Sequence, residues 1–170
     1  MSSISTEQKT KGRKGISSDT VYPIVLTRLE GATTVVVGGG LVGERKVSGL
    51  LAVGAMVRLI SPEATRQLQH WADQGCIEWE KRGYQEGDLD QARLVFAATD
   101  HREVNVRVAR DAARLGVLCN VVDNPADGDF HLPAVYRGED TVIAVSTAGK
   151  SPTQARRLRD KIAEWLRGGI

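Results

Sequence analysis

The chain has 170 residues, of which 41% are hydrophobic and 26% are charged, and this size fits one globular domain with a small appendage. A repeat array and a large multidomain enzyme are therefore excluded. The 23 Lys and Arg residues nearly balance the 21 Asp and Glu residues, so the formal charge of +2 provides no field that would favour nucleic acid as a partner.

Neither a membrane segment nor a secretory signal is visible in the sequence. No apolar run approaches the roughly 18 residues that a membrane-spanning helix requires, so we expect a cytoplasmic protein with no membrane partner. Residues 1–20 are rich in Ser, Thr, Lys and Gly, which predicts a disordered tail. The cysteines, Cys76 and Cys119, lie far apart and lack the spacing of a metal site, so we interpret both as buried thiols.

The first predicted unit is a strand, a tight turn and a helix. A β-branched run at 33–37 meets a glycine cluster, and apolar residues at helical spacing then continue up to Gly54. A second strand at 56–60 completes a βαβ unit. We predict that the next helix begins at 61–63 and reaches about Gly75, because proline suits the first helical position.

The alternation of strands and helices continues toward the middle of the chain. Strands are predicted at 77–80, 94–98 and 118–122, and a helix is predicted at 102–115. The strands are continuous apolar runs without the alternation of polar residues that a sheet with one solvent-exposed face would show. They indicate an α/β fold with a Rossmann-type, doubly wound parallel sheet over residues 21–124. In such a sheet the ligand binds beyond the carboxyl ends of the strands.

Residues 125–170 follow a different pattern. Two short apolar runs, at 130–135 and 141–145, flank a polar turn at Gly138 and predict an antiparallel β-hairpin. A C-terminal helix is then predicted over 151–167, with serine at its N-terminal cap. The apolar stripe of this helix consists of Ala155, Leu158, Ile162 and Trp165.

The strongest chemical signal is the sequence GGGLVG, which satisfies G-x-G-x-x-G directly after a predicted strand and before a helix. Gly38 would permit the tight turn, Gly40 would let a pyrophosphate approach the backbone, and Gly43 would let the helix pack on the strand. The alternative is a glycine-rich turn kept for backbone reasons alone. The predicted phosphate-binding residues are Gly38, Gly39, Gly40, Leu41, Val42 and Gly43.

The ribose end of this site is marked less clearly. Ser61 stands where an acidic residue is expected at the end of the second strand, and Glu63 comes late for that role. We include Ser61 and Pro62 among the cofactor-binding residues. Arg58 or Arg66 could instead meet the 2′-phosphate of NADP, so spacing alone leaves NAD and NADP open.

Polar residues also end the next two strands. Thr99 and Asp100 would border the nicotinamide half of a dinucleotide, and the alternative is that Asp100 only caps the next helix. Asp123 ends the following strand, where a carboxylate can accept a proton as a hydride leaves or can hold a cation. The alternative for Asp123 is a turn residue before Asn124. None of the three histidines has a partner at metal-ligand spacing, so no metal site is predicted.

Several motifs occur in order between Tyr22 and Arg159. They are VVVGGGLVGERK, LLAVGA, SPE, AATD with Asn105, NVVD with Phe130 and Pro133, and AVSTAGKSP with Arg156 and Arg159. In this combination the chain resembles the siroheme synthase N-terminal family. Members of that family are precorrin-2 dehydrogenases, and some are also sirohydrochlorin ferrochelatases.

The resemblance implies an NAD-dependent oxidation of precorrin-2, an octacarboxylate tetrapyrrole, to sirohydrochlorin on the route to siroheme. It also implies that Asp123 is the catalytic carboxylate and that Thr99 lies near the cofactor. The expected substrate-binding residues are Asn120, Ser146, Thr147, Lys150 and Arg156.

The family exchanges its hairpin between subunits, so the resemblance further implies a homodimer with residues 125–170 as a dimerisation and substrate segment. Because the chain stops at Ile170, we expect no methyltransferase domain and little of the helical C-terminal module of longer members. This expectation leaves the insertion of ferrous iron open. The competing interpretations are a non-enzymatic nucleotide-sensing Rossmann module and another NAD(P)-dependent reductase, and both leave the NVVD and GKSP motifs without a role.

Overall fold

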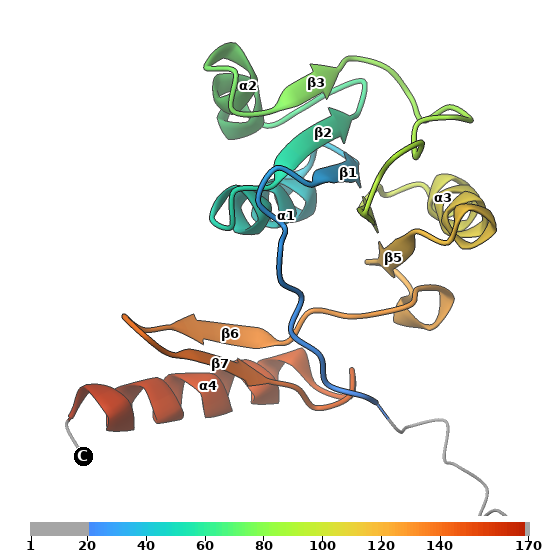
Figure 1. Ribbon diagram of the computed structural model, residues 1–170. Coiled ribbons are helices and arrows are strands. Elements are labelled where there is room, and N and C mark those ends of the chain that lie inside the picture. The colour runs from blue at the N-terminus through green and yellow to red at the C-terminus, as the bar shows by residue number, and fades with distance from the viewer. Residues whose placement is uncertain (1–20, 169–170) are drawn as a thin grey trace, which may run out of the picture.

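The computed structural model describes residues 21–168, so the tail predicted at 1–20 lies outside the described residues. Five parallel strands form one sheet in the order β3-β2-β1-β4-β5, and β6 and β7 form a separate antiparallel hairpin (Figure 1). The elements in chain order are β1 (Thr33–Val37), α1 (Leu41–Leu51), β2 (Met56–Ile60), α2 (Arg66–Asp73), β3 (Glu78–Glu80), β4 (Leu94–Ala97), α3 (Arg102–Leu115), β5 (Leu118–Val121), η1 (Pro125–Asp127), β6 (Ala134–Arg137), β7 (Val142–Val145) and α4 (Pro152–Arg167).

The core lies on both faces of the parallel sheet. On one face, Val47 of α1 and Leu68 of α2 share a buried cluster with Val36 of β1. On the other face, Val108 of α3 shares a second buried cluster with Val95 of β4. Burying each such side chain contributes about 1.5–3 kcal/mol. The predicted Rossmann-type sheet, followed by a hairpin and a C-terminal helix, is therefore confirmed.

The second helix begins later than predicted. It starts at Arg66 because Thr65 caps it: the Thr65 hydroxyl accepts a hydrogen bond from the Leu68 N–H at 3.3 Å. The Thr65 N–H donates in turn to the Gly39 carbonyl at 2.9 Å. Residues 61–64 consequently form a loop beside the glycine turn instead of the first turn of a helix.

The first hairpin strand also begins later than predicted, because residues 128–133, here called the strap, approach β5 instead. The Asp129 N–H donates to the Cys119 carbonyl at 2.8 Å, and the Asp129 carboxylate accepts from the Cys119 N–H at 2.9 Å. The Asn120 amide donates to the Phe130 carbonyl at 2.7 Å. These bonds hold the strap along β5 before the hairpin starts at Ala134.

The prediction of two buried thiols is wrong for Cys76, which is exposed between α2 and β3. Cys119 is buried in β5. Burial, together with the nearby carboxylate of Asp129, raises the pKa of the Cys119 thiol to about 12. The Cys119 thiol therefore stays protonated at neutral pH.

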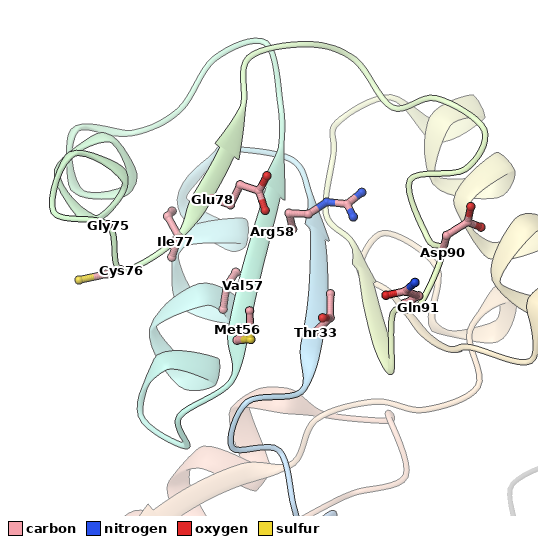
Figure 2. A pocket seen from close by; sticks show the side chains of 10 residues that line it. All are labelled: Thr33, Met56, Val57, Arg58, Gly75, Cys76, Ile77, Glu78, Asp90 and Gln91. Atoms are coloured by element: carbon pink, nitrogen blue, oxygen red, sulfur yellow. The ribbon is translucent and has the colours of Figure 1, made fainter.

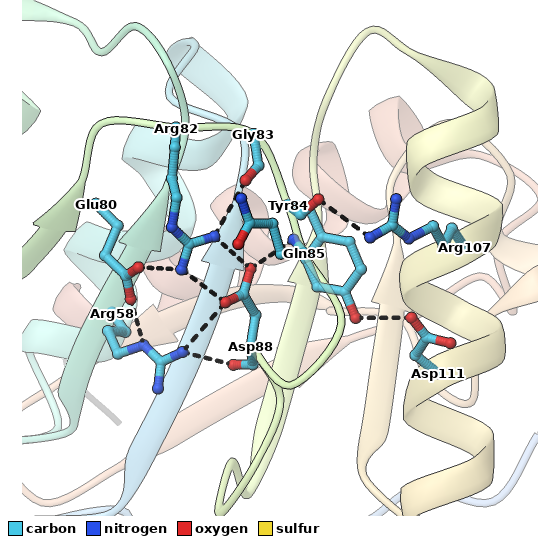
Figure 3. Close-up of polar contacts among 9 residues, drawn as sticks. All are labelled: Arg58, Glu80, Arg82, Gly83, Tyr84, Gln85, Asp88, Arg107 and Asp111. Carbon is cyan, nitrogen blue, oxygen red and sulfur yellow. Dashed lines mark hydrogen bonds and ion pairs between the residues drawn. The ribbon is translucent and has the colours of Figure 1, made fainter.

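The connection between β3 and β4 contains no helix and is held by charges (Figure 3). Asp88 is only 5% exposed, and its carboxylate accepts two hydrogen bonds from Arg82, at 2.7 and 2.8 Å, and one from the Gln85 N–H at 2.7 Å. Arg58 of β2 donates to the Asp88 carbonyl at 2.8 Å and pairs with Glu80 at 3.1 Å. The Arg58 guanidinium is thus already engaged by this loop, which disfavours the suggestion that it meets a cofactor phosphate.

This cluster predicts a pH-dependent stability. Burial by itself raises the pKa of Asp88, but the hydrogen bonds from Arg82 and Gln85 and the nearby positive charges outweigh it and hold the pKa below its usual value. A carboxyl group with a lowered folded-state pKa stabilises the fold above its unfolded-state pKa of about 4. This stabilisation is lost as the pH falls through the lower, folded-state value.

We expect Asp88→Asn to lower the free energy of unfolding by about 2 kcal/mol at neutral pH, because the amide leaves Arg82 without its charged partner. The difference from the wild type should shrink as the pH falls below about 4. Urea unfolding at a series of pH values measures both effects. Asp90→Asn, which changes an exposed carboxylate of the same loop, is the control. An equal loss in both variants would contradict the assignment.

Candidate functional site

A cavity of about 860 Å³ opens at the carboxyl ends of the parallel strands. It is lined by residues 38–42, 61–65 and 98–101 together with Val122, which come from the ends of β1, β2, β4 and β5. Nine of the ten predicted cofactor-binding residues lie on this lining, and Gly43 is the exception. The position agrees with the rule that open α/β sheets bind ligands beyond the carboxyl ends of their strands.

Three glycines of the loop are fixed by close backbone contacts. Gly38 has a φ of +118°, and a Cβ built on it would lie 2.4 Å from the Ala98 carbonyl oxygen. A Cβ on Gly43 would lie 2.0 Å from the Gly38 carbonyl oxygen. The tight turn predicted for Gly38 and the close packing predicted for Gly43 are therefore both seen. A Cβ on Gly39 would lie 2.0 Å from the Glu63 carbonyl oxygen, a constraint that the motif alone did not suggest.

Gly40 differs, because a Cβ on it would meet no atom within 4 Å. It is the N-terminal cap of α1, and no side chain caps the helix there. The first N–H groups of α1 therefore have no side-chain acceptor at the edge of the cavity. Open space beside uncapped N–H groups at a helix N-terminus suits a phosphate. The loop thus fits the pyrophosphate of a dinucleotide.

Ser61 joins the end of β2 to the glycine loop. Its hydroxyl oxygen accepts a hydrogen bond from the Gly39 N–H at 3.0 Å, and its carbonyl accepts one from the Trp79 indole at 3.0 Å. The Thr65 hydroxyl donates to the Glu44 carboxylate at 2.5 Å, which ties the start of α2 to α1. The sequence marked Ser61 only as a replacement for an acidic residue, whereas the structure shows that it supports the loop.

Asn105, which the sequence analysis named only beside the AATD motif, has a role that sequence reasoning missed. It is 0% exposed in the first turns of α3, and its amide nitrogen donates to the Thr99 carbonyl at 3.0 Å and to Asp123 Oδ1 at 2.9 Å. Its amide oxygen accepts from the Thr99 N–H at 3.2 Å and from the Thr99 hydroxyl at 2.7 Å. One side chain therefore joins the ends of β4 and β5. The available signal was an amide on the same buried stripe as Val108 and Ala112.

Asp123 is held at both of its oxygens and still reaches solvent. Its Oδ2 lies 3.3 Å from the guanidinium of Arg102, and its side chain is 33% exposed. Arg102 also pairs with Asp127 of η1. The carboxylate is thus oriented by Arg102 and Asn105, which is more than a turn residue would need.

Asp100 does not cap α3, so that alternative is wrong. The N-terminal cap is His101, without a side-chain hydrogen bond, and the His101 N–H donates to the Thr99 hydroxyl at 3.2 Å. The Asp100 side chain is exposed at the cavity.

The structure separates the predicted substrate residues into two groups. Asn120 lies in β5 beside the strap, whereas the others belong to the turn after β7 and to the start of α4. None of them lines the cavity. His131 of the strap lies 3.2 Å from the Ser146 hydroxyl, so the strap and the turn meet. The residues of the second group are Ser146, Thr147, Lys150 and Arg156.

A second, smaller cavity of about 370 Å³ lies at the amino ends of the strands (Figure 2). Its lining includes Thr33, Met56 and Cys76. Arg58 is the cation on this lining, and it is already paired with Glu80. This cavity also lies at the edge of the sheet where α/β folds do not usually bind ligands. We therefore place the candidate site at the carboxyl ends.

Comparison with known families agrees with this placement. A family model described as "Putative NAD(P)-binding" matches residues 25–134, which include the whole parallel sheet. The chain belongs to this NAD(P)-binding family. A second model, described as "Sirohaem biosynthesis protein central", matches residues 143–164, which include most of α4. None of the helices that the structure describes is long and apolar enough to cross a membrane.

Among curated relatives, this NAD(P)-binding chain is similar to siroheme synthases. It is 40% identical over 141 residues to the siroheme synthase of Nitrosococcus oceani, and the similarity covers 83% of this chain and 30% of that protein. It is 42% identical over 145 residues to the siroheme synthase of Pseudomonas putida strain W619, and the similarity covers 85% of this chain and 31% of that protein. The chain thus spans about 30% of the length of these relatives.

A solved structure named "SirC, precorrin-2 dehydrogenase" is similar with a TM-score of 0.71 and 25% sequence identity. The similarity covers 85% of this chain and 70% of that chain. Together with the siroheme synthases, it confirms the resemblance to the siroheme synthase N-terminal family that the motifs indicated.

Proposed function

We propose that the protein is a precorrin-2 dehydrogenase, which oxidises precorrin-2 to sirohydrochlorin with NAD. The observation that carries this proposal is the position of Asn105, which ties Thr99, on the lining of the cavity at the carboxyl ends of the strands, to the carboxylate of Asp123. A cofactor site and a base are thereby held side by side. The similarity to a precorrin-2 dehydrogenase and to siroheme synthases supports the choice of substrate.

The cofactor residues follow from the cavity. Residues 38–42 would hold the pyrophosphate through the N–H groups that begin α1, while Ser61 and Pro62, also on the lining, would border the adenosine. Thr99 and Asp100, which line the cavity as well, would border the nicotinamide. When bound, NAD supplies the acceptor for a hydride.

Asp123 accepts the proton that the substrate loses as the hydride leaves, so that one hydride and one proton are removed in each oxidation. Asn105 and Arg102 keep its two oxygens in position. Because the side chain is partly exposed, the proton can then pass to solvent.

The direct test is an anaerobic incubation of the purified protein with enzymatically generated precorrin-2 and either NAD or NADP, followed by visible spectroscopy. Sirohydrochlorin that forms with NAD supports the proposal. Absence of oxidation with both cofactors, despite measurable nucleotide binding, would favour a nucleotide-sensing module. Ferrous iron is added last. Siroheme formation above the protein-free rate would add chelatase activity with iron as the second substrate.

We also propose that residues 21–124 bind the cofactor and that residues 125–170 join two copies of the chain. Ala155 and Ala163 are buried on one side of α4, and Arg159 between them donates to the Val135 carbonyl of β6 at 3.3 Å. This side therefore packs on the hairpin. The rest of the predicted apolar stripe is exposed. Its exposed members are Leu158, Ile162 and Trp165, the last of them 62% exposed.

An exposed apolar stripe of this kind suits a second subunit. We expect the double variant Leu158→Glu and Ile162→Glu to convert a dimer into a monomer of 18.4 kDa, because two carboxylates would be buried unpaired in the interface. Size-exclusion chromatography with light scattering measures the mass. Arg157→Glu, which changes an exposed charge outside the stripe, should remain dimeric. A wild-type monomer, or a dimer that survives the double variant, would contradict the interface.

A further inference from the structure

Glu63 brings a carboxylate to the cofactor cavity beside the glycine loop. It is exposed and lies on the cavity lining, two residues beyond Ser61. Its spacing in the sequence is late for the acidic residue expected at the end of β2. Residues 61–64 form a loop beside the glycine turn, however, where the sequence predicted the first turn of a helix. This loop is what brings Glu63 to the cavity.

The position of Glu63 is fixed by contacts of the backbone with the glycine loop. A Cβ on Gly39 would lie 2.0 Å from the Glu63 carbonyl oxygen, so the two backbones touch. On either side of Glu63, the Ser61 hydroxyl accepts from the Gly39 N–H at 3.0 Å and the Thr65 N–H donates to the Gly39 carbonyl at 2.9 Å. In α/β dinucleotide sites the adenosine ribose lies between the phosphate loop and the end of the second strand. Glu63 stands on that side of the loop.

The charges on the cavity lining suit a ribose without a phosphate. Among the described residues, no lysine or arginine lines the cavity, and its acidic side chains are Glu63 and Asp100. The Asp100 carboxylate lies beyond β4, 3.5 Å from the His101 ring. The Glu63 carboxylate has no hydrogen-bond or ion-pair partner within residues 21–168. A free carboxylate accepts hydrogen bonds from a ribose diol and repels a phosphate placed on the same sugar.

We propose that Glu63 selects NAD over NADP, by accepting hydrogen bonds from the adenosine ribose and by repelling a 2′-phosphate. This inference rests on the proposed function, which requires a dinucleotide in this cavity. The competing cation is Arg66, which begins α2, is exposed and does not line the cavity. Glu63 is then a specificity-determining residue of the cofactor site, separate from the carboxylate that takes the proton.

The test measures the Kd of NAD and of NADP by calorimetric titration, without precorrin-2, for the wild type and for Glu63→Gln. Glutamine keeps the length of the side chain and removes its charge. We expect the Kd of NAD to rise about tenfold, because the ribose loses a charged acceptor. The Kd of NADP should fall about tenfold, because the repulsion of the 2′-phosphate is removed. The preference for NAD, which is the ratio of the two Kd values, thus falls on the order of 100-fold.

Two further variants separate the charge of Glu63 from a general effect. Glu63→Asp keeps the charge on a shorter side chain, so NADP should stay weakly bound while the affinity for NAD falls. Asp73→Asn removes a negative charge from an exposed residue that ends α2 and does not line the cavity. This control should bind both nucleotides like the wild type. None of the variants should lower the Tm, because Glu63 meets Gly39 through its backbone.

An unchanged preference for NAD in Glu63→Gln would overturn the inference and leave the proposed function intact. Equal binding of NAD and NADP by the wild type would also overturn it, and a loss of NADP binding in Arg66→Gln would then assign the 2′-phosphate to Arg66. An equal loss of preference in Asp73→Asn would overturn it by assigning the effect to the net charge. A wild-type protein that binds neither nucleotide would remove the proposed function itself.

Discussion

Asp123→Asn is expected to bind NAD normally and to lose precorrin-2 oxidation by about 10²- to 10⁴-fold in kcat, which is the usual cost of removing a general base. Asparagine has the same shape as aspartate, and its oxygen can still accept the hydrogen bond from Asn105. An amide cannot take a proton from the substrate, however. The variant therefore separates the positioning of residue 123 from its chemistry.

Asp127→Asn is the control for this experiment, because it removes the other carboxylate that pairs with Arg102 without touching Asp123 itself. Anaerobic initial rates give kcat, and a fluorescence titration gives the Kd of NAD for each variant. Undiminished turnover in Asp123→Asn would remove this carboxylate from the mechanism. A comparable loss in Asp127→Asn would assign the effect to Arg102 instead.

Gly40→Val is expected to weaken NAD binding on the order of 100-fold while the protein stays folded. The backbone of Gly40, with φ −80° and ψ −176°, is an extended conformation that valine adopts readily. No atom lies within 4 Å of the new Cβ, so the fold has room for the side chain. The valine would occupy the space that we assign to the pyrophosphate.

Gly49→Val provides a matched comparison in the same helix. Gly49 is exposed, a Cβ on it also meets no atom within 4 Å, and it does not line the cavity. This variant should bind NAD normally. Calorimetric titration with NAD and a thermal melt of each variant measure the two effects. An unchanged NAD affinity in Gly40→Val would contradict the phosphate site.

The sequence predicted the parallel sheet well because the residues that define each strand and turn are neighbours in the sequence. The β2 bounds agree to the residue, since Met56–Ile60 is an apolar run that follows the turn at Gly54 and ends at Ser61. The glycine loop could be placed for the same reason, because its motif is contiguous and its neighbours are a strand and a helix. That these residues bind NAD stays a prediction.

The remaining features depend on contacts between residues that are distant in the sequence. The start of α2 follows from the bond between Thr65 and Gly39, and the late start of β6 follows from the pairing of the strap with Cys119. Neither partner is visible in the local pattern, which favoured proline as a helix start and an earlier strand. The role of Asn105 was hidden in the same way, because Asp123 lies 18 positions further along the chain.

Asn105 bonds to both Thr99 and Asp123, and this limits which residues position 105 can accept. Aspartate at position 105 could accept from Thr99, but it would set one carboxylate against another at Asp123. Leucine would fill the volume and offer neither donor nor acceptor, and glutamine is one methylene too long for a fully buried slot. A single substitution at this position would thus damage the nucleotide pocket and the proton acceptor together. The proposed nucleotide site and the proposed proton acceptor thus depend on one side chain, so a substitution of Asn105 that impairs one is expected to impair the other.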